Sequence, residues 1–106
     1  MALLQIPVRN DLPSYTMRVE LDGSIFILRF RYNERSTRWY MDISTEENEL
    51  IVGGIALLTG VPLISQYVDS RLPEGDFVVF DRASKNENPS RETFGEDIEL
   101  FYNEAA

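Results

Sequence analysis

The chain has 106 residues, of which 43% are hydrophobic, and it contains neither Cys nor His. This length and composition suit one domain over 1–106 with a modest core. The missing residue types exclude disulfides, cysteine-based metal sites, thiol catalysis and His-dependent triads.

The net charge of −8 is unevenly distributed along the chain. Residues 1–41 hold six Arg against four acidic residues, whereas residues 42–106 hold fourteen acidic residues against four basic ones. An acidic chain repels phosphates, which disfavours nucleic-acid binding. A basic part next to an acidic remainder is compatible with pairing with other copies or with charged neighbours. From the charge alone we favour the alternative, a solvated acidic surface that keeps the protein soluble.

The N-terminal part alternates apolar and polar residues, a pattern that predicts strands. Residues 2–8 predict a short strand, and two longer strands follow over 15–21 and 24–32. Asp22 and Gly23 join the longer strands and favour a type I′ hairpin turn, because Gly adopts positive φ at little cost. The expected core-facing residues are Tyr15, Met17, Val19, Leu21, Phe26, Leu28, Phe30 and Tyr32.

A polar turn over 33–36 leads to a further strand over 37–44, which completes a second hairpin. Neighbouring residues of a strand face opposite ways, so we interpret Trp39 as a core anchor and Tyr40 as outward-facing. For Tyr40, a contact with a partner and ordinary surface packing both stay open. Asp42 is expected to pair with a strand arginine rather than to bind a metal. The candidate partner-binding residues are Arg31, Asn33, Arg35, Arg38, Tyr40 and Asp42.

The C-terminal part predicts three more strands, over 50–58, 75–81 and 97–103. Gly53 and Gly54 interrupt the first of them. Paired glycines inside a strand indicate a bulge, a bend or the close approach of another backbone.

Two segments between these strands have no clear period. Residues 63–67 fit either one helical turn or an extended piece, and the polar residues 82–95 predict a long exposed loop. The sum is about six to seven strands with at most one short helix, which predicts an all-β fold, either a small antiparallel β-barrel or a sandwich. We favour the barrel, because a strongly curved sheet would explain the paired glycines and remove exposed edges.

The sequence offers no catalytic constellation. Ser44 and Ser65 have no partner His, and Lys85 lies in a polar loop without apolar cover, so a Ser–Lys dyad has almost no support. No Gly-rich phosphate loop is present, and no segment approaches the roughly 20 apolar residues of a membrane helix. We therefore expect no enzyme activity, catalytic residue, cofactor, bound metal or membrane partner. A carboxylate-dependent hydrolase is kept as a third hypothesis.

Residues 29–43, Arg-Phe-Arg-Tyr-Asn-Glu-Arg-Ser-Thr-Arg-Trp-Tyr-Met-Asp-Ile, resemble the signature hairpin of the small phage baseplate plug family, which is known from a cyanophage tail baseplate. The resemblance continues from about residue 15 to the end of the chain. Its further segments are Gly54–Tyr67, Gly75–Asp81, Thr93–Gly95 and Leu100–Tyr102.

This resemblance implies a structural protein of the virion, located in the tail baseplate and assembled in the host cytoplasm. It implies a protein that plugs or caps the distal end of the tail tube and organises hub and spike proteins. Its partners would be other baseplate, hub and spike proteins, and copies of itself in a trimer or hexamer, without specific nucleic-acid binding. The alternative from the residues alone is a small β-barrel module that binds an oligosaccharide or a peptide.

Overall fold

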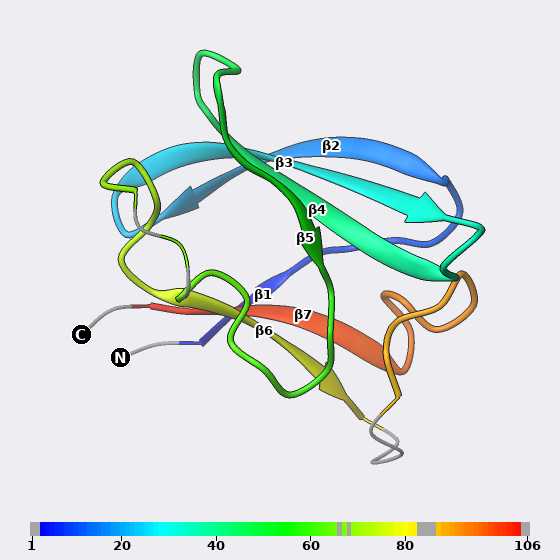
Figure 1. Cartoon of the computed structure of the whole chain (residues 1–106). Helices are drawn as coiled ribbons and strands as arrows, with labels where there is room; N and C mark the ends of the chain where they lie inside the picture. The colour runs from blue at the N-terminus through cyan, green and yellow to red at the C-terminus, as the bar shows by residue number, and fades with distance from the viewer. Residues whose placement is uncertain (1–2, 66, 68, 83–86, 105–106) are drawn as a thin grey trace.

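The computed structural model describes residues 3–65, 67, 69–82 and 87–104. These residues form seven strands and no helix. The strands are β1 (Leu3–Ile6), β2 (Ser14–Leu21), β3 (Ser24–Asn33), β4 (Arg38–Thr45), β5 (Leu50–Ala56), β6 (Asp76–Asp81) and β7 (Ile98–Asn103). Two antiparallel sheets, of order β1-β7-β6 and β2-β3-β4-β5, face each other (Figure 1). In the described part of the chain, no helix is long and apolar enough to cross a membrane.

The four-stranded sheet is a meander whose first turn follows the sequence prediction. Leu21 pairs with Ser24, and the two residues between them, Asp22 and Gly23, have φ of +50° and +83°. Positive φ at both central residues is the type I′ geometry, which matches the twist of the flanking strands. The predicted hairpin is therefore confirmed, and β3 lies between β2 and β4.

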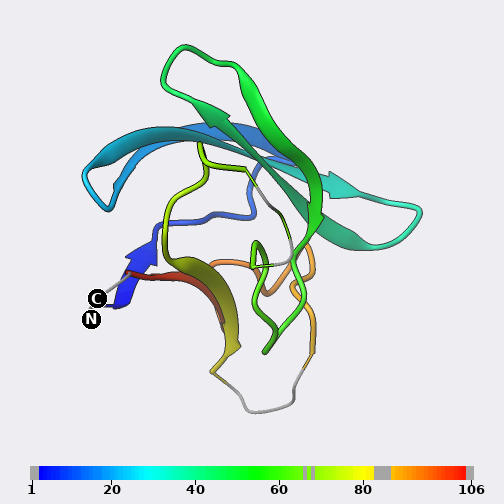
Figure 2. The same cartoon turned by 60° about the vertical axis from the view of Figure 1, so that its left-hand side comes forward.

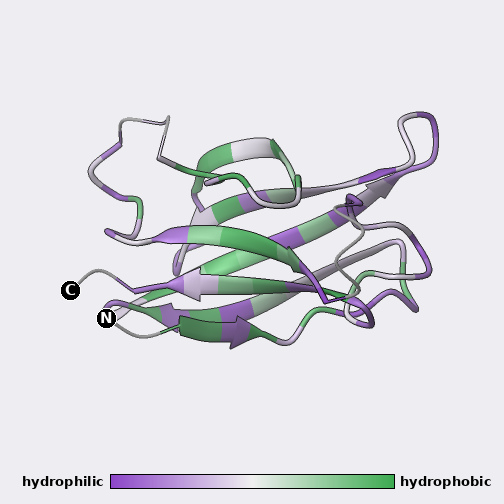
Figure 3. Ribbon diagram, turned by 90° about the horizontal axis from the view of Figure 1, so that it is seen from below, coloured by the Kyte–Doolittle hydropathy of each residue, from purple (hydrophilic) through white to green (hydrophobic). Residues whose placement is uncertain are grey.

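One hydrophobic core fills the space between the sheets. The predicted core-facing residues of β2 and β3 all belong to it or pack against it. Figure 3 shows both apolar and polar bands along the strands. Trp39 is completely buried, as predicted, and its ring centroid lies 5.0 Å from that of Phe94 and 5.4 Å from that of Tyr32. Its indole N–H donates to the Ser90 carbonyl at 3.0 Å.

The sandwich is bridged on one side and open on the other. After β5 the chain crosses from one sheet to the other. The Leu57 N–H still donates to the Trp39 carbonyl of β4 at 3.0 Å, and the Gly60 N–H donates to the Val79 carbonyl of β6 at 3.0 Å. On the other side, no backbone hydrogen bond joins β1 to β2 among the described residues. The sandwich prediction is therefore confirmed and the favoured closed barrel is wrong, because the chain bridges the two sheets along one side only.

The glycine pair lies at a β-bulge, one of the three alternatives that the sequence left open. Met41 pairs with Ile55 and Ile43 with Val52, so β5 has one residue more than β4 between these two pairs. Gly54 adopts φ of +70°, a conformation that favours Gly.

The loop before β7 is less exposed than the sequence suggests. Phe94 is completely buried and Pro89 is buried, whereas Glu87, Asn88, Glu92 and Gly95 are exposed as predicted. The apolar side chains of this loop complete the core at one end. Residues 83–86, which include Lys85, lie outside the described part of the chain, as does residue 66 in the segment 63–67.

Candidate interaction surface

The outward face of the sheet β2–β5 carries most of the predicted partner-binding residues. In the ladder between β3 and β4, Arg31 lies opposite Tyr40 and Asn33 opposite Arg38, so these four side chains share one face. Asp42 lies on the same face, opposite Arg29. The β3–β4 hairpin projects beyond the body of the sandwich (Figure 2).

Asp42 links β3, β4 and β5 at the centre of this face, because its carboxylate contacts both Arg31 and the Gly54 backbone. Its Oδ1 lies 3.0 Å from the Arg31 Nη2 and accepts the Gly54 N–H at 2.8 Å. The ion pair with a strand arginine is therefore confirmed. The side chain of Asp42 is only 13% exposed, against 44% for Arg31. The carboxylate satisfies the backbone at the bulge and orients one guanidinium, which is a structural role the sequence did not reveal.

Asn33 fixes the turn of the projecting hairpin. Its Oδ1 accepts the backbone N–H groups of Arg35 at 2.9 Å and Ser36 at 3.1 Å. This geometry is the Asx-type turn that Asn favours. Tyr40 supports the same turn, because its hydroxyl donates to the Ser36 Oγ at 3.2 Å. Asn33 and Tyr40 therefore stabilise the hairpin that presents the neighbouring arginines.

Arg35 and Arg38 are the two predicted residues that stay available to a partner. Both are exposed, and neither guanidinium forms an ion pair or hydrogen bond within the described part of the chain. Guanidinium groups present five donors in a planar fork that suits carboxylates. The tip of the hairpin thus offers cationic donors on a backbone that internal hydrogen bonds hold in place.

A shallow groove of about 530 Å³ continues this surface toward β2 and β5. Its lining residues include Thr16, Ile27, Arg29, Asp42 and Leu50. The prediction missed Arg29, although the alternation that places Arg31 outward also places Arg29 there. It also missed Leu50, which is 58% exposed and pairs with Ser44 beyond a second register shift of the β4–β5 ladder.

The aromatic side chains are not arranged as a surface stacking platform. Tyr15 stacks on Phe30 at 5.2 Å between ring centroids, and this pair lies between the two sheets with Trp39. Tyr40 is the one aromatic side chain that β2–β5 place on the outward face. Stacking on a sugar or a base, which needs exposed rings, therefore has little support on this face.

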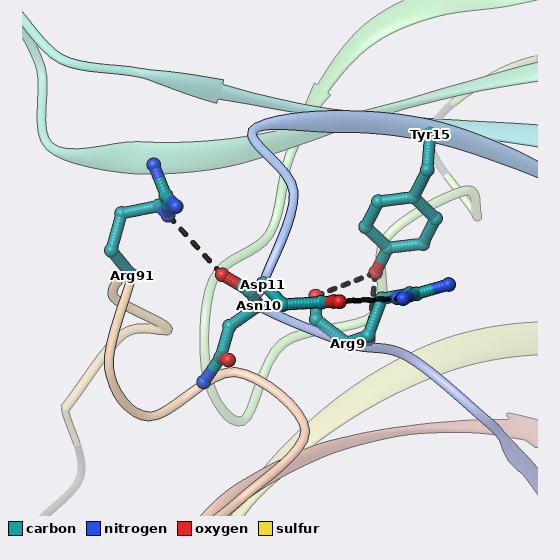
Figure 4. Close-up of polar contacts among 5 residues, drawn as sticks. All are labelled: Arg9, Asn10, Asp11, Tyr15 and Arg91. Atoms are coloured by element: carbon teal, nitrogen blue, oxygen red, sulfur yellow. Dashed lines mark hydrogen bonds and ion pairs between the residues drawn. The ribbon is translucent and has the colours of Figure 1, made fainter.

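A second polar cluster closes one end of the sandwich (Figure 4). Arg9 forms a bidentate pair with Asp11, with Nε···Oδ1 at 2.6 Å and Nη2···Oδ2 at 2.5 Å. The Tyr15 hydroxyl accepts the Arg9 N–H and donates to the Arg9 carbonyl, each at 2.9 Å. Burial raises the pKa of Tyr15 to about 12. The Arg91 Nε donates to the Asn10 carbonyl at 3.4 Å, which ties the loop before β7 to the segment before β2.

Two carboxylates, those of Asp81 and Glu99, are buried at the end of β6 and in β7. Glu99 pairs with Arg82, and the Asp81 Oδ2 accepts the Glu87 N–H at 3.2 Å. No group of three or more acidic residues that could hold a metal ion occurs among the residues described. These carboxylates stabilise β6, β7 and the loop between them.

These features define a small all-β sandwich domain with one arginine-bearing sheet face. A family model described as "Cyanophage baseplate Pam3 plug gp18" matches residues 3–105. The chain therefore belongs to this family of phage baseplate plug proteins, which confirms the resemblance seen in the hairpin and extends it to β1. No curated protein matches the chain.

Proposed function

We propose that this protein is a structural component of a phage tail baseplate that closes the distal end of the tail tube. The family match over residues 3–105 carries the proposal. On this proposal the protein is not an enzyme, resides in the virion and is assembled with the tail in the host cytoplasm. Its partners are hub and spike proteins and further copies of itself.

The outward face of β2–β5 is the surface we assign to docking. Arg35 and Arg38 extend from a hairpin whose turn is fixed by Asn33, so little backbone ordering opposes binding. Arg29 adds a third exposed cation in the adjoining groove. A partner that presents carboxylates would match this face in charge and in hydrogen-bonding geometry.

Assembled tails test the plug assignment and the docking surface separately. Cryo-electron microscopy of tails that carry the unaltered protein should show its density at the distal end of the tube. Replacing both arginines of the hairpin, Arg35→Glu with Arg38→Glu, should leave the purified protein folded but reduce its occupancy in tails at least about tenfold.

Arg71→Glu is a matched control for this charge reversal. Arg71 is exposed and lies near Phe26 and Thr45, at the end of the sheet opposite the β3–β4 turn. It should leave tail occupancy unchanged. Full occupancy of the double variant would remove the docking role of the hairpin, whereas absence of the unaltered protein from the distal tube end would overturn the plug function itself.

A further inference from the structure

The outer edge of β2 is an unpaired, regular strand of eight residues. All eight residues pair with β3 without a bulge, and β2 ends the order of its sheet. The described residues provide no backbone partner for its other edge. Strand edges in natural proteins are usually protected by Pro, bulges, inward-pointing charges or charged side chains on the edge strand. Of these, β2 has only two outward charges of opposite sign, Arg18 and Glu20.

The ladder shows which backbone groups point outward. The Tyr32 N–H donates to the Pro13 carbonyl at 2.8 Å, and antiparallel pairs alternate between bonded and non-bonded residues. The odd-numbered residues of β2 therefore bond β3, and the N–H and C=O groups of Thr16, Arg18 and Glu20 point away from the sheet. These groups form a free template for another antiparallel strand.

Most core-facing side chains of β2 are also only partly covered by the rest of the protein. Tyr15, Met17 and Val19 face the core but stay half-buried, while the neighbouring residues of β3, Leu28 and Phe30, are completely buried. A further strand beside the C-terminal part of β2 would cover Met17 and Val19. The structure thus has both a free backbone edge and a partly open core at the same place.

We propose that β2 pairs with β2 of a second copy of this chain, antiparallel about a two-fold axis at Val19. In this register Arg18 of each copy lies opposite Glu20 of the other, so two ion pairs form on the outward face. A two-fold axis at Arg18 would instead place like charges opposite each other. The other edge strands match β2 less well, because β1 offers four residues and no charge, β5 contains the bulge, and β6 is bridged at Val79.

The pairing joins two four-stranded sheets into one eight-stranded sheet. Arg18 must leave Glu46, whose carboxylate lies 2.9 Å away, but both side chains are at least half exposed and such pairs contribute little. This dimer would be one of the contacts between copies that the proposed function requires. The dimer itself does not depend on the proposed function, but its location in the tail does. Purified protein tests the dimer, so this inference can fail while the protein still occupies tails.

Charge variants test the register by sedimentation velocity. Arg18→Glu and Glu20→Arg should each raise the dissociation constant of the dimer by about tenfold or more, because each places like charges opposite each other twice. A mixture of the two variants should recover the dimer, since every facing pair is then of opposite charge. Glu49→Arg, an exposed charge beside β5 at the opposite edge of the same sheet, should dimerise as the unaltered protein does.

A single introduced cysteine gives an independent readout, because the chain has no Cys. Facing residues of a non-bonded antiparallel pair lie about 4.5 Å apart between Cα atoms, within disulfide range. Val19→Cys should therefore form a disulfide-linked dimer under mild oxidation, and Met17→Cys should not. A monomer at all concentrations, a dimer insensitive to the charge variants, or cross-linking through Met17→Cys alone would each overturn the proposal.

Discussion

Replacing Trp39 by Ala tests whether the hairpin has one core face and one partner face. The ring is completely buried, and it contacts Phe94 and Tyr32 at centroid distances of 5.0 and 5.4 Å. Its N–H also satisfies the Ser90 carbonyl. Removing a buried Trp side chain lowers the free energy of unfolding by about 3–5 kcal/mol. A domain of this size has about 5–15 kcal/mol in total, so Trp39→Ala should lose much of its stability.

The measurement is urea denaturation followed by far-ultraviolet circular dichroism, since the substitution removes the only Trp. Trp39→Phe is the matched control, because it keeps an aromatic ring but leaves the Ser90 carbonyl without its donor. We expect it to lose about 1–3 kcal/mol. A loss below about 1 kcal/mol for Trp39→Ala would refute the assignment of Trp39 as the core anchor.

Three further predictions concern positions that the sequence alone did not explain. Asp42→Ala leaves the Gly54 N–H without an acceptor and should lower the free energy of unfolding in urea by about 1–3 kcal/mol, whereas an unchanged midpoint would mean that the bulge does not need this bond. Gly95→Ala should lower the melting temperature by several degrees, on the order of 4–8 °C for each kcal/mol lost, because Gly95 has φ of +85° and its Cβ would lie 2.5 Å from the Val8 carbonyl oxygen. The raised pKa of Tyr15 favours the neutral phenol in the folded state, so its contribution is complete below about pH 10 and is lost as the pH rises from about 10 toward 12. Tyr15→Phe should flatten the stability profile in that window, and an unchanged slope would contradict the assignment.

Local periodicity predicted the parts of the fold that depend on neighbours in the sequence. The two-residue alternation assigned the inner faces of β2, β3 and β4, and the Asp22-Gly23 turn defined the first hairpin because its backbone preferences are intrinsic. The same alternation separated Trp39 from Tyr40. These features need no knowledge of which strand pairs with which.

The features that were missed all depend on distant segments. Phe94 lies in a polar stretch and becomes part of the core because it meets Trp39 and Phe30 across the sandwich. The second role of Asp42 needs Gly54, which only the β4–β5 register brings to it. The choice between a barrel and a sandwich depended on whether β1 meets β2, which no local pattern reports.

The position of β7 between β1 and β6 has a consequence for folding during synthesis. The meander β2–β5 uses neighbouring strands and can pair as it leaves the ribosome. In the other sheet, residues 3–6 and 76–81 form their strand ladders with residues 98–103, and β6 has besides a few short contacts with residues 59–64. Both outer strands must therefore wait for the last of the seven strands to complete the sheet. Until then the apolar inner face of the meander stays uncovered, and ribosome-bound chains that end before residue 98 should be the state most exposed to chaperones and aggregation.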